Sequence, residues 1–438
     1  MEKIIILFKL GIKYLYRYRR RYIFLFAALV FCFAIVTFIT SSKDGMYDNV
    51  YYSAQSHYAG DVVAVGYNPQ IDMAHHMGGS EISALLDAVD ASGINPGRIV
   101  YRTLFGNTGV IYFNGNAVVQ KYIIGCDWEK EEHLFSKMDF ISPLEYPVSD
   151  DEIILSAPVA NQLGASVGDI IILEVDNRYS QKNTGRFIIK GIVRDNSIFG
   201  YFKVYISRFT LNRLLLFDDN DCSTIGFFFD NPSAAEKNRS SLYSFLTERT
   251  QTGPLVYDRE GMESETTQPW SWEGTKVFLY TMQVYLSEVT DLMEAMDLMT
   301  YLLYGMMLII ILVSAAVTYR LILHERAKEM GVMRAIGFYG SDLRMVLWTE
   351  VIILGFISIA AGFILSLFFS AAASFISFSW FPSFEIFLRN GKLTALYLPN
   401  TIIVNMIFTL LVLAAAVIIP SLRASGKNLP SLLSGEPL

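Results

Sequence analysis

The chain has 438 residues, of which 53% are hydrophobic and 18% are charged, and its formal net charge is −7. Soluble proteins usually carry about 25% charged residues, so this composition is atypical of a soluble protein and indicates a membrane protein. The negative balance also speaks against a nucleic-acid-binding protein, which needs clustered positive charge.

Four runs without charge are each long enough for a helix that crosses about 30 Å of hydrocarbon, which takes about 20 residues. They predict four membrane-spanning helices, at residues 22–40, 298–320, 346–376 and 400–421. Residues 1–21 carry seven Lys and Arg but one acid, and the loop 321–345 is also rich in Lys and Arg. Because positive residues collect on the cytoplasmic side, we expect both termini and this loop to be cytoplasmic.

Charge divides the chain into an acidic outer region and a basic remainder. Residues 41–296 contain 19 Lys and Arg and 34 Asp and Glu, a balance of −15, whereas the remaining residues contain 16 and 8, a balance of +8. We therefore expect a multi-pass protein of the cytoplasmic (inner) membrane, with an extracytoplasmic domain at 41–297. Residues 1–21 are expected to form a cytoplasmic interfacial helix, 377–399 a short external loop and 422–438 a cytoplasmic tail.

The outer region is expected to have an α+β fold of two packed subdomains. The first membrane helix should continue outward through Tyr58 and end before Gly60. Asn114-Gly115 predicts a hairpin turn between two strands. The expected strands are 61–66, 99–105, 110–113, 117–124, 152–155, 170–175, 187–193, 204–206 and 224–229, and the expected helices are 81–89, a short one after Ser156, and 234–247. A single helix is predicted from 276 to 323, long enough to stand above the membrane and then cross it.

The sequence offers no catalytic site. It has no G-x-x-x-x-G-K-[ST] motif, so it lacks the loop that would hold the phosphates of ATP. His75-His76 could begin a metal site, but no cysteine or acidic spacing completes one, so we expect no bound metal. The chain is therefore predicted to be neither an enzyme nor the carrier of a cofactor.

Two further features of the outer region have ordinary explanations. The carboxylate pair Glu131-Glu132 is interpreted as part of a solvated surface. Cys126 and Cys222 could form a disulfide in an oxidising compartment or remain free thiols, because two cysteines are no disulfide framework.

The most informative stretch is His324–Gly337, in the basic loop between the second and third membrane helices. Charged side chains alternate there with apolar ones, and Gly331 and Gly337 allow close approach or a turn. Such a helix either connects two membrane helices or offers a surface to a partner protein. The residue pattern alone favours neither.

This stretch resembles the signature of the FtsX/MacB/LolC–LolE superfamily of ABC-transporter permeases, an E-R-x-x-E-I-G-x-x-R-A-I-G run followed by an acid in the third membrane helix, here Glu350. The residues that carry the resemblance are Glu325, Arg326, Glu329, Met330, Gly331, Arg334, Ala335 and Gly337. The outer region resembles the periplasmic core of MacB in Asp151–Leu155, Leu163–Asp169 and Phe187–Val193. The pieces Asp44–Tyr47 and Tyr58–Asp61 are most similar to the lipoprotein-releasing LolE-type branch.

The resemblance implies a permease of the mechanotransmission type. A separate ATPase subunit would bind ATP and Mg²⁺ and dock on the 321–345 loop, and a second permease copy or paralogue would complete a dimer. The substrate would be a lipoprotein taken from the outer leaflet, with no nucleic acid as partner. The alternatives are an FtsX-like regulator of an external enzyme and an export permease for a small molecule or peptide.

A substrate groove that contacts membrane lipids is expected near the outer ends of the first two membrane helices. The candidate residues are Phe38, Ile39, Tyr301 and Tyr304. Their position is equally typical of an aromatic belt at the membrane interface.

Overall fold

The computed structural model describes residues 2–71, 75–106, 109–120, 122–194, 203–266, 272–378, 387–389 and 391–426. The chain forms two compact units. We call residues 1–47, 293–377 and 392–438 the helical unit, and residues 48–292 and 378–391 the sheet unit. Most of the predicted tail, from residue 427 onward, and much of the predicted 377–399 loop lie outside the described residues.

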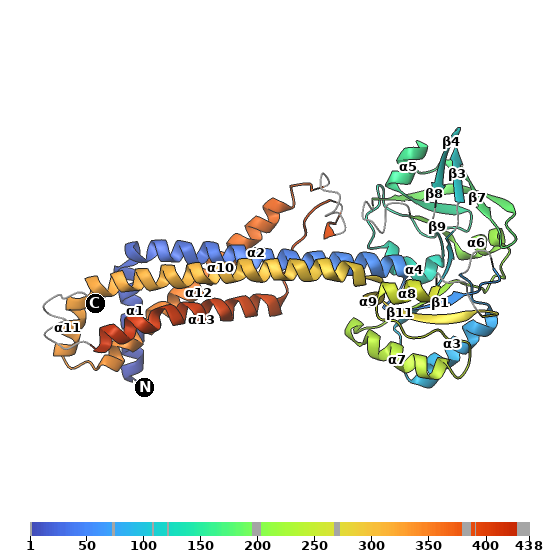
Figure 1. The fold of residues 1–438 in the computed structure, drawn as a ribbon. Coiled ribbons are helices and arrows are strands. Elements are labelled where there is room, and N and C mark those ends of the chain that lie inside the picture. The colour runs from blue at the N-terminus through green and yellow to red at the C-terminus, as the bar shows by residue number, and fades with distance from the viewer. Residues whose placement is uncertain are drawn as a thin grey trace. The chain divides into compact units, whose positions relative to one another are not determined.

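Helices build the helical unit (Figure 1). They are α1 (Glu2–Arg17), α2 (Arg19–Tyr58), α10 (Ser287–Glu325), α11 (Ala327–Ala335), α12 (Gly340–Ala373) and α13 (Pro399–Gly426). Two of them, α2 and α10, have residues 48–58 and 287–292 in the sheet unit. Among the described residues, α2, α10, α12 and α13 are long and apolar enough to cross a membrane. This confirms the four predicted membrane helices, whereas the positions of the membrane boundaries and the orientation stay predictions.

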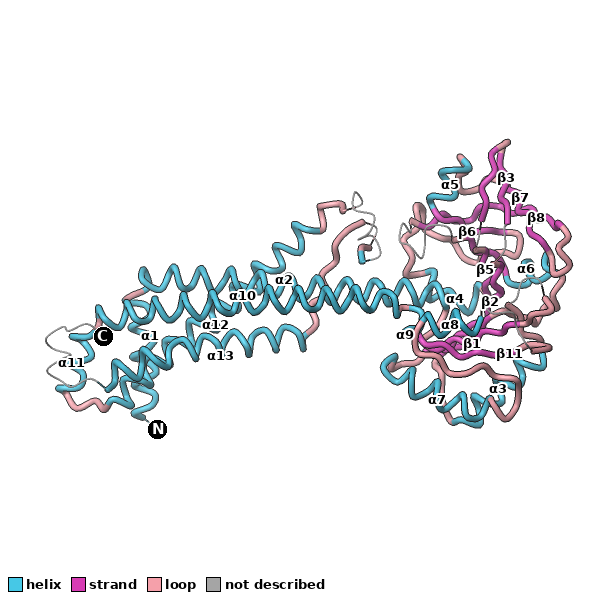
Figure 2. The backbone as a smooth tube through the Cα atoms, in the orientation of Figure 1, coloured by secondary structure: helices cyan, strands magenta, loops and turns pink. Residues whose placement is uncertain are grey.

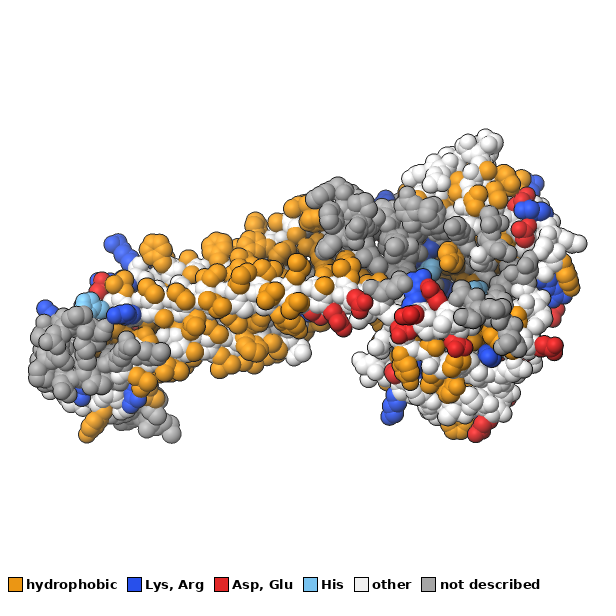
Figure 3. Space-filling view, in the orientation of Figure 1, with side chains coloured by type: hydrophobic (Ala, Val, Ile, Leu, Met, Phe, Trp, Pro, Cys, Tyr) orange, Lys and Arg blue, Asp and Glu red, His pale blue; other side chains and the backbone are white. Residues whose placement is uncertain are grey.

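The four apolar helices share one core. Figures 1 and 2 show α2 and α10 side by side, and Tyr22 of α2 packs against Tyr319 of α10 with ring centroids 5.9 Å apart. Val351 of α12 and Leu413 of α13 complete the same buried cluster. The outward surface of these helices is apolar as well (Figure 3), as expected for side chains that face lipid or another membrane protein.

One eleven-stranded sheet runs through the described part of the sheet unit, in the order β11-β1-β10-β2-β5-β9-β6-β8-β7-β3-β4. Its strands are β1 (Val62–Tyr67), β2 (Arg98–Phe105), β3 (Gly109–Phe113), β4 (Asn116–Gln120), β5 (Ile123–Cys126), β6 (Glu152–Ser156), β7 (Ile170–Asp176), β8 (Lys182–Val193), β9 (Val204–Ser207), β10 (Thr224–Phe228) and β11 (Lys276–Thr281). The helices of the unit are α3 (Gly79–Ser92), α4 (Trp128–Phe135), α5 (Ala157–Leu163), α6 (Arg208–Leu215), α7 (Ala235–Leu246), α8 (Arg259–Thr266) and α9 (Met282–Tyr285).

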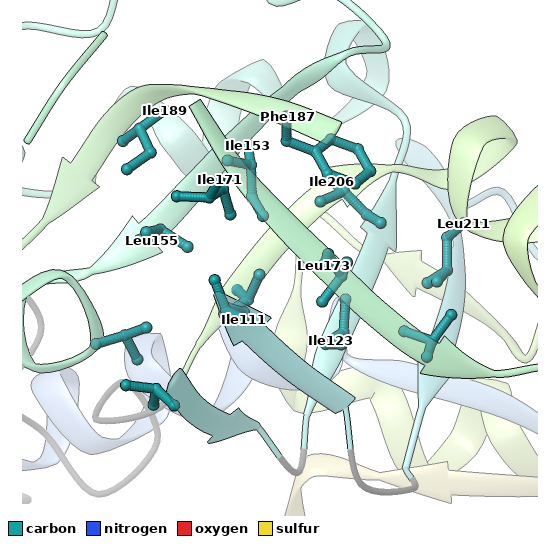
Figure 4. Packing of buried hydrophobic residues seen from close by; sticks show 14 of the residues in the cluster. Ile111, Ile123, Ile153, Leu155, Ile171, Leu173, Phe187, Ile189, Ile206 and Leu211 are labelled. Atoms are coloured by element: carbon teal, nitrogen blue, oxygen red, sulfur yellow. The ribbon is translucent and has the colours of Figure 1, made fainter. Parts of the chain in front are cut away.

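Two large apolar cores lie on this sheet. Helices α5 and α6 cover one part, where alternate residues of β7 and β8 such as Ile171, Leu173 and Phe187 point inward (Figure 4). Helices α3 and α7 cover the other part through Leu85 and Leu242. The predicted α+β fold is confirmed, but the two expected subdomains share one sheet.

Two predicted elements were wrong. The run 117–124 is not one strand: β4 pairs with β3, whereas β5 pairs with β2 and β9, and alternation cannot show a change of partner. The helix predicted from 276 begins only at Ser287, because residues 276–281 form strand β11 along β1. A short apolar run fits a strand and a helix equally well, so the pattern could not place this boundary.

Candidate functional site

A buried ion pair fixes the start of the loop between α10 and α12. Arg326 lies between α10 and α11, and its Nη1 donates to both carboxylate oxygens of Glu350 on α12, at 3.0 and 2.9 Å. Both side chains are buried. The Tyr22 hydroxyl of α2 donates to Glu350 Oε2 at 2.6 Å. Helices α2 and α12 and the junction between α10 and α11 therefore meet at one carboxylate. A buried charge pair of this kind is tolerated only when its geometry is good.

Aromatic side chains of the first helices enclose the same guanidinium group. The Arg326 guanidinium carbon lies 4.2 Å from the ring centroid of Tyr14 and 5.1 Å from that of Tyr18. Planar guanidinium groups stack favourably on such rings. The Tyr18 hydroxyl also donates to Glu329 at the start of α11. The N-terminal segment therefore contacts the start of the loop through Tyr14 and Tyr18, in addition to the contact made by α12.

The inner face of α11 rests on apolar side chains. Met330 packs with Leu323 of α10 and with Leu343 and Leu347 of α12 in a small buried cluster. Gly331 is buried beside it. This face cannot contact another protein unless α11 moves.

The outer face of the loop exposes a group of apolar side chains, which we call the loop patch: Val332, Ala335, Ile336 and Tyr339. Val332 is 51% exposed, Ile336 74% and Tyr339 72%. Gly337, with φ of +106°, makes the turn between Ile336 and Tyr339, a conformation that favours glycine. An apolar patch on a loop predicted to be cytoplasmic is a candidate protein-binding surface.

The structure divides the predicted coupling residues between these two faces. Buried residues are Arg326, Met330 and Gly331; partly buried residues are Glu329 and Arg334; exposed residues are Glu325, Ala335 and Gly337. Whether they couple to an ATPase stays a prediction. Sequence reasoning missed Tyr14, Tyr18 and Tyr22. Their spacing of four residues would suggest one helix face, but the helix breaks at Tyr18, so Tyr14 lies on α1 and Tyr22 on α2.

The predicted groove residues contact different neighbours. The Phe38 ring packs edge-on against Phe369 of α12, with centroids 6.2 Å apart, and the Tyr304 ring packs against Phe408 of α13. Tyr301 is exposed, and Ile39 is partly buried. That these four residues line one groove stays a prediction.

In the sheet unit, the two adjacent histidines have separate surroundings. His76 Nε2 lies 2.9 Å from Asp221 Oδ2, whereas burial lowers the pKa of His75 to about 4. Within the described ranges, no three His, Cys, Asp or Glu side chains are grouped as a metal site would require.

The two cysteines and the adjacent glutamates of the sheet unit differ in their surroundings. Cys126 and Cys222 are free thiols in two separate buried clusters, and burial raises the pKa of Cys222 to about 12. Glu131, interpreted as solvated, is fully buried against Arg102, while its neighbour Glu132 is exposed. The acidic pair therefore spans the inner and outer faces of α4.

The C-terminal part of the chain is similar to a known protein family. Residues 301–429, which include most of α10 and all of α11, α12 and α13, match the family of the FtsX-like permease C-terminal domain. No curated protein matches the chain.

Solved structures similar to this chain include an extracellular domain, a periplasmic region and a domain of a permease. The extracellular domain of the noncanonical ABC-type transporter YknZ from Gram-positive bacteria is 12% identical over 43% of this chain and 93% of that one, with a TM-score of 0.30. The periplasmic region of MacB from Actinobacillus actinomycetemcomitans is 11% identical over 54% and 96%, also with a TM-score of 0.30. A domain of a putative permease from Porphyromonas gingivalis is 13% identical over 51% and 89%, with a TM-score of 0.27. At these TM-scores the likenesses carry no argument.

Proposed function

We propose that this chain, whose residues 301–429 match the FtsX-like permease C-terminal family, is the membrane subunit of an ABC transporter driven by a separate ATPase. The permease domain and the four long apolar helices support this general function. In the proposal, the helices cross the cytoplasmic membrane, the termini and α11 are cytoplasmic, and the sheet unit is extracytoplasmic. ATP and Mg²⁺ bind to the partner ATPase.

The observation that carries the proposal is the division of the loop into a fixed and an exposed face. The loop patch is open to a partner, while Arg326 joins the base of the loop to Glu350 of α12 and, through it, to Tyr22 of α2. A displacement of α11 must therefore either break this buried pair or carry α2 and α12 with it. Breaking such a pair is costly, because it leaves a buried charge uncompensated.

The mechanism follows from this linkage. The ATPase would contact the loop patch differently in its ATP-bound and ADP-bound states, since a partner shifts an equilibrium only by its differential affinity for the two states. The resulting movement of α2 would alter the sheet unit without any continuous pore. A second permease copy or paralogue would present the same surfaces to a second ATPase.

The docking step is tested by a single charge in the loop patch. Ile336→Asp should reduce copurification of the ATPase at least tenfold, because a carboxylate would be desolvated in an apolar interface. Val119→Asp, a matched change at a side chain 56% exposed in the sheet unit, should leave it unchanged. Full retention of the ATPase by Ile336→Asp would remove the loop patch from the proposal.

For the substrate, we propose a lipoprotein lifted from the outer leaflet. The support is the resemblance of Asp44–Tyr47 and Tyr58–Asp61 to the LolE-type branch. Moving an acyl chain from lipid to water costs about 0.8 kcal/mol per CH₂ group, which explains why ATP would be needed. The acyl chain would enter between the outer ends of α2 and α10, near Phe38 and Tyr301.

Photo-crosslinking at Phe38 and Tyr301 tests this substrate. A crosslinker there should capture a lipoprotein in membranes without ATP and lose it when ATP is added. Capture of lipid alone, together with unchanged lipoprotein distribution after depletion of the protein, would rule out lipoprotein release. A copurified hydrolase would then favour a regulator of an external enzyme, and a captured small molecule or peptide would favour an exporter.

A further inference from the structure

The C-terminal end of α2 is held inside the sheet unit by a buried arginine. Arg102 of β2 is 1% exposed and Glu131 of α4 is 0% exposed. Arg102 Nε donates to both oxygens of the Glu131 carboxylate at 3.1 and 3.0 Å. Its Nη1 donates to the carbonyl oxygens of Ser56 and His57 at 3.0 and 2.8 Å. The last carbonyls of a helix lack partners within the helix and favour a positive group, so the guanidinium completes the end of α2.

A buried carboxylate holds the preceding turns of the same helix. Asp61 is 1% exposed, and its Oδ1 accepts hydrogen bonds from the Tyr51 hydroxyl at 2.7 Å and from Gln55 Nε2 at 2.8 Å. Its Oδ2 accepts the backbone N–H of Phe229, next to β10, at 2.8 Å. One side chain therefore ties two turns of α2 to the sheet.

Directly after α2, the backbone passes close to β10. A Cβ atom added to Gly226 of β10 would lie 1.5 Å from the carbonyl oxygen of Ala59, so only glycine fits there. The Tyr58 ring stacks on Tyr285 of α9, with centroids 3.7 Å apart. The end of α2 thus contacts β2, β10 and α9, and it cannot tilt without disturbing all three.

We propose that Arg102 and Asp61 are positioning residues that make the end of α2 a rigid joint, so that a movement of α2 becomes a movement of the sheet unit. This inference rests on the proposed function, in which α2 is displaced from its cytoplasmic end. A helix attached at one point could pivot within the sheet unit. Attachment at the carbonyls of residues 56 and 57 and at side chains 51, 55 and 58 prevents that pivoting.

The test removes the joint while keeping the core filled. The paired variant Arg102→Met, Glu131→Leu replaces both charges with apolar groups of similar volume, a change that is often neutral for folding, and it deletes the donors to Ser56 and His57. Arg239→Met is the matched control, because Arg239 is equally buried but bonds to Val256 and Glu236 on the α7 side. Tyr51→Phe, Gln55→Met weakens the joint independently from the α2 side.

The first measurement is hydrogen exchange in the full chain bound to its ATPase. In the paired variant, amides of residues 52–60 should exchange at least tenfold faster than in the wild type, and in the Arg239→Met control they should not. Unchanged exchange in the paired variant and in the Tyr51→Phe, Gln55→Met variant would show that these contacts do not hold α2, and it would overturn the joint.

The second measurement is the distance between spin labels on cysteines placed at Ser240 of α7 and Ser374 after α12, both exposed. The wild type should change this distance between ATP and ADP, and the paired variant should lose the change while the complex still hydrolyses ATP. An equal change in both proteins would overturn the joint alone. A wild type with no change at all would overturn the proposed transmission itself, so the two failures are distinguishable.

Discussion

The helical unit and the sheet unit each contain a buried arginine–glutamate pair that contacts α2. The two pairs differ in how many of the guanidinium donors form hydrogen bonds. In the sheet unit, the Arg102 guanidinium donates to Glu131 and to two carbonyls of α2. In the helical unit, Arg326 donates from Nη1 to Glu350. Its Nε lies 3.9 Å from the Glu329 carboxylate and donates no hydrogen bond within the described part of the chain.

This difference shows which end of α2 can adjust. A pair whose donors are bonded to the backbone of a helix fixes that helix in place. The Arg326 guanidinium stacks on the rings of Tyr14 and Tyr18, and stacking depends less on direction than a hydrogen bond does. Arg326 can therefore shift over these rings while it stays bonded to Glu350. We therefore expect the helical-unit pair to move with α11 and the sheet-unit pair to stay closed.

The largest effect is expected from opening the sheet-unit pair. Glu131→Ala leaves the Arg102 charge buried without its counterion, so it should lower the free energy of unfolding of the sheet unit by about 3–5 kcal/mol. Glu132→Ala, at the exposed neighbour, should change it by less than about 0.5 kcal/mol. Hydrogen exchange of β2 and α4 measures both. Equal small effects would mean that the pair contributes little and that the contrast between the two units is wrong.

A smaller effect is expected at the helical-unit pair. Glu350→Gln keeps an acceptor for Arg326 and Tyr22 but removes the charge, so it should destabilise the contact between α11 and α12 by about 2–3 kcal/mol. The matched control is Glu325→Gln, since Glu325 is exposed and pairs with Arg21, and it should cost less than about 1 kcal/mol. Exchange of the amides of residues 327–350 gives both values. A loss at Glu350→Gln as large as at Glu131→Ala would show that both pairs are equally rigid.

The sequence predicted the membrane helices and the continuation of α2 because these features are properties of single segments. Uncharged runs mark the spans, and an unbroken helical pattern leads to Tyr58. The loop 324–337 was also identified, by its resemblance to a signature. Its division into a buried and an exposed face was not, since a charged residue such as Arg326 gives no indication of burial.

The buried arginine–glutamate pairs could not be predicted from the sequence, for a physical reason. Arg102 and Glu131 stand 29 positions apart, and their meeting depends on how β2, α4 and the end of α2 pack together. Charged residues are almost never fully buried unless they are paired, so Glu131 beside Glu132 has the pattern of a surface. The strand β11 was missed similarly, since its partner β1 is more than 200 residues away in the chain.

The smallest effect is expected on the pH dependence of stability, which should differ between the sheet unit and the helical unit. Burial lowers the pKa of His75 to about 4, from an ordinary value of 6.5, and its ring contacts Tyr67 of β1. Between these values the unfolded chain binds a proton that the folded sheet unit does not, so this contribution to stability is complete above pH 6.5 and is lost as the pH falls toward 4. Because His75 is partly exposed, we expect a loss of about 1 kcal/mol in the free energy of unfolding between pH 7 and pH 5.

The full chain is denatured in detergent at each pH, and hydrogen exchange of β1 and β11 monitors its unfolding. This measurement should show the loss, and His75→Phe should reduce it. Exchange in the core of α12, followed in the same sample, is the internal control for a general effect of acid. A pH dependence that His75→Phe leaves unchanged would exclude His75 as its cause.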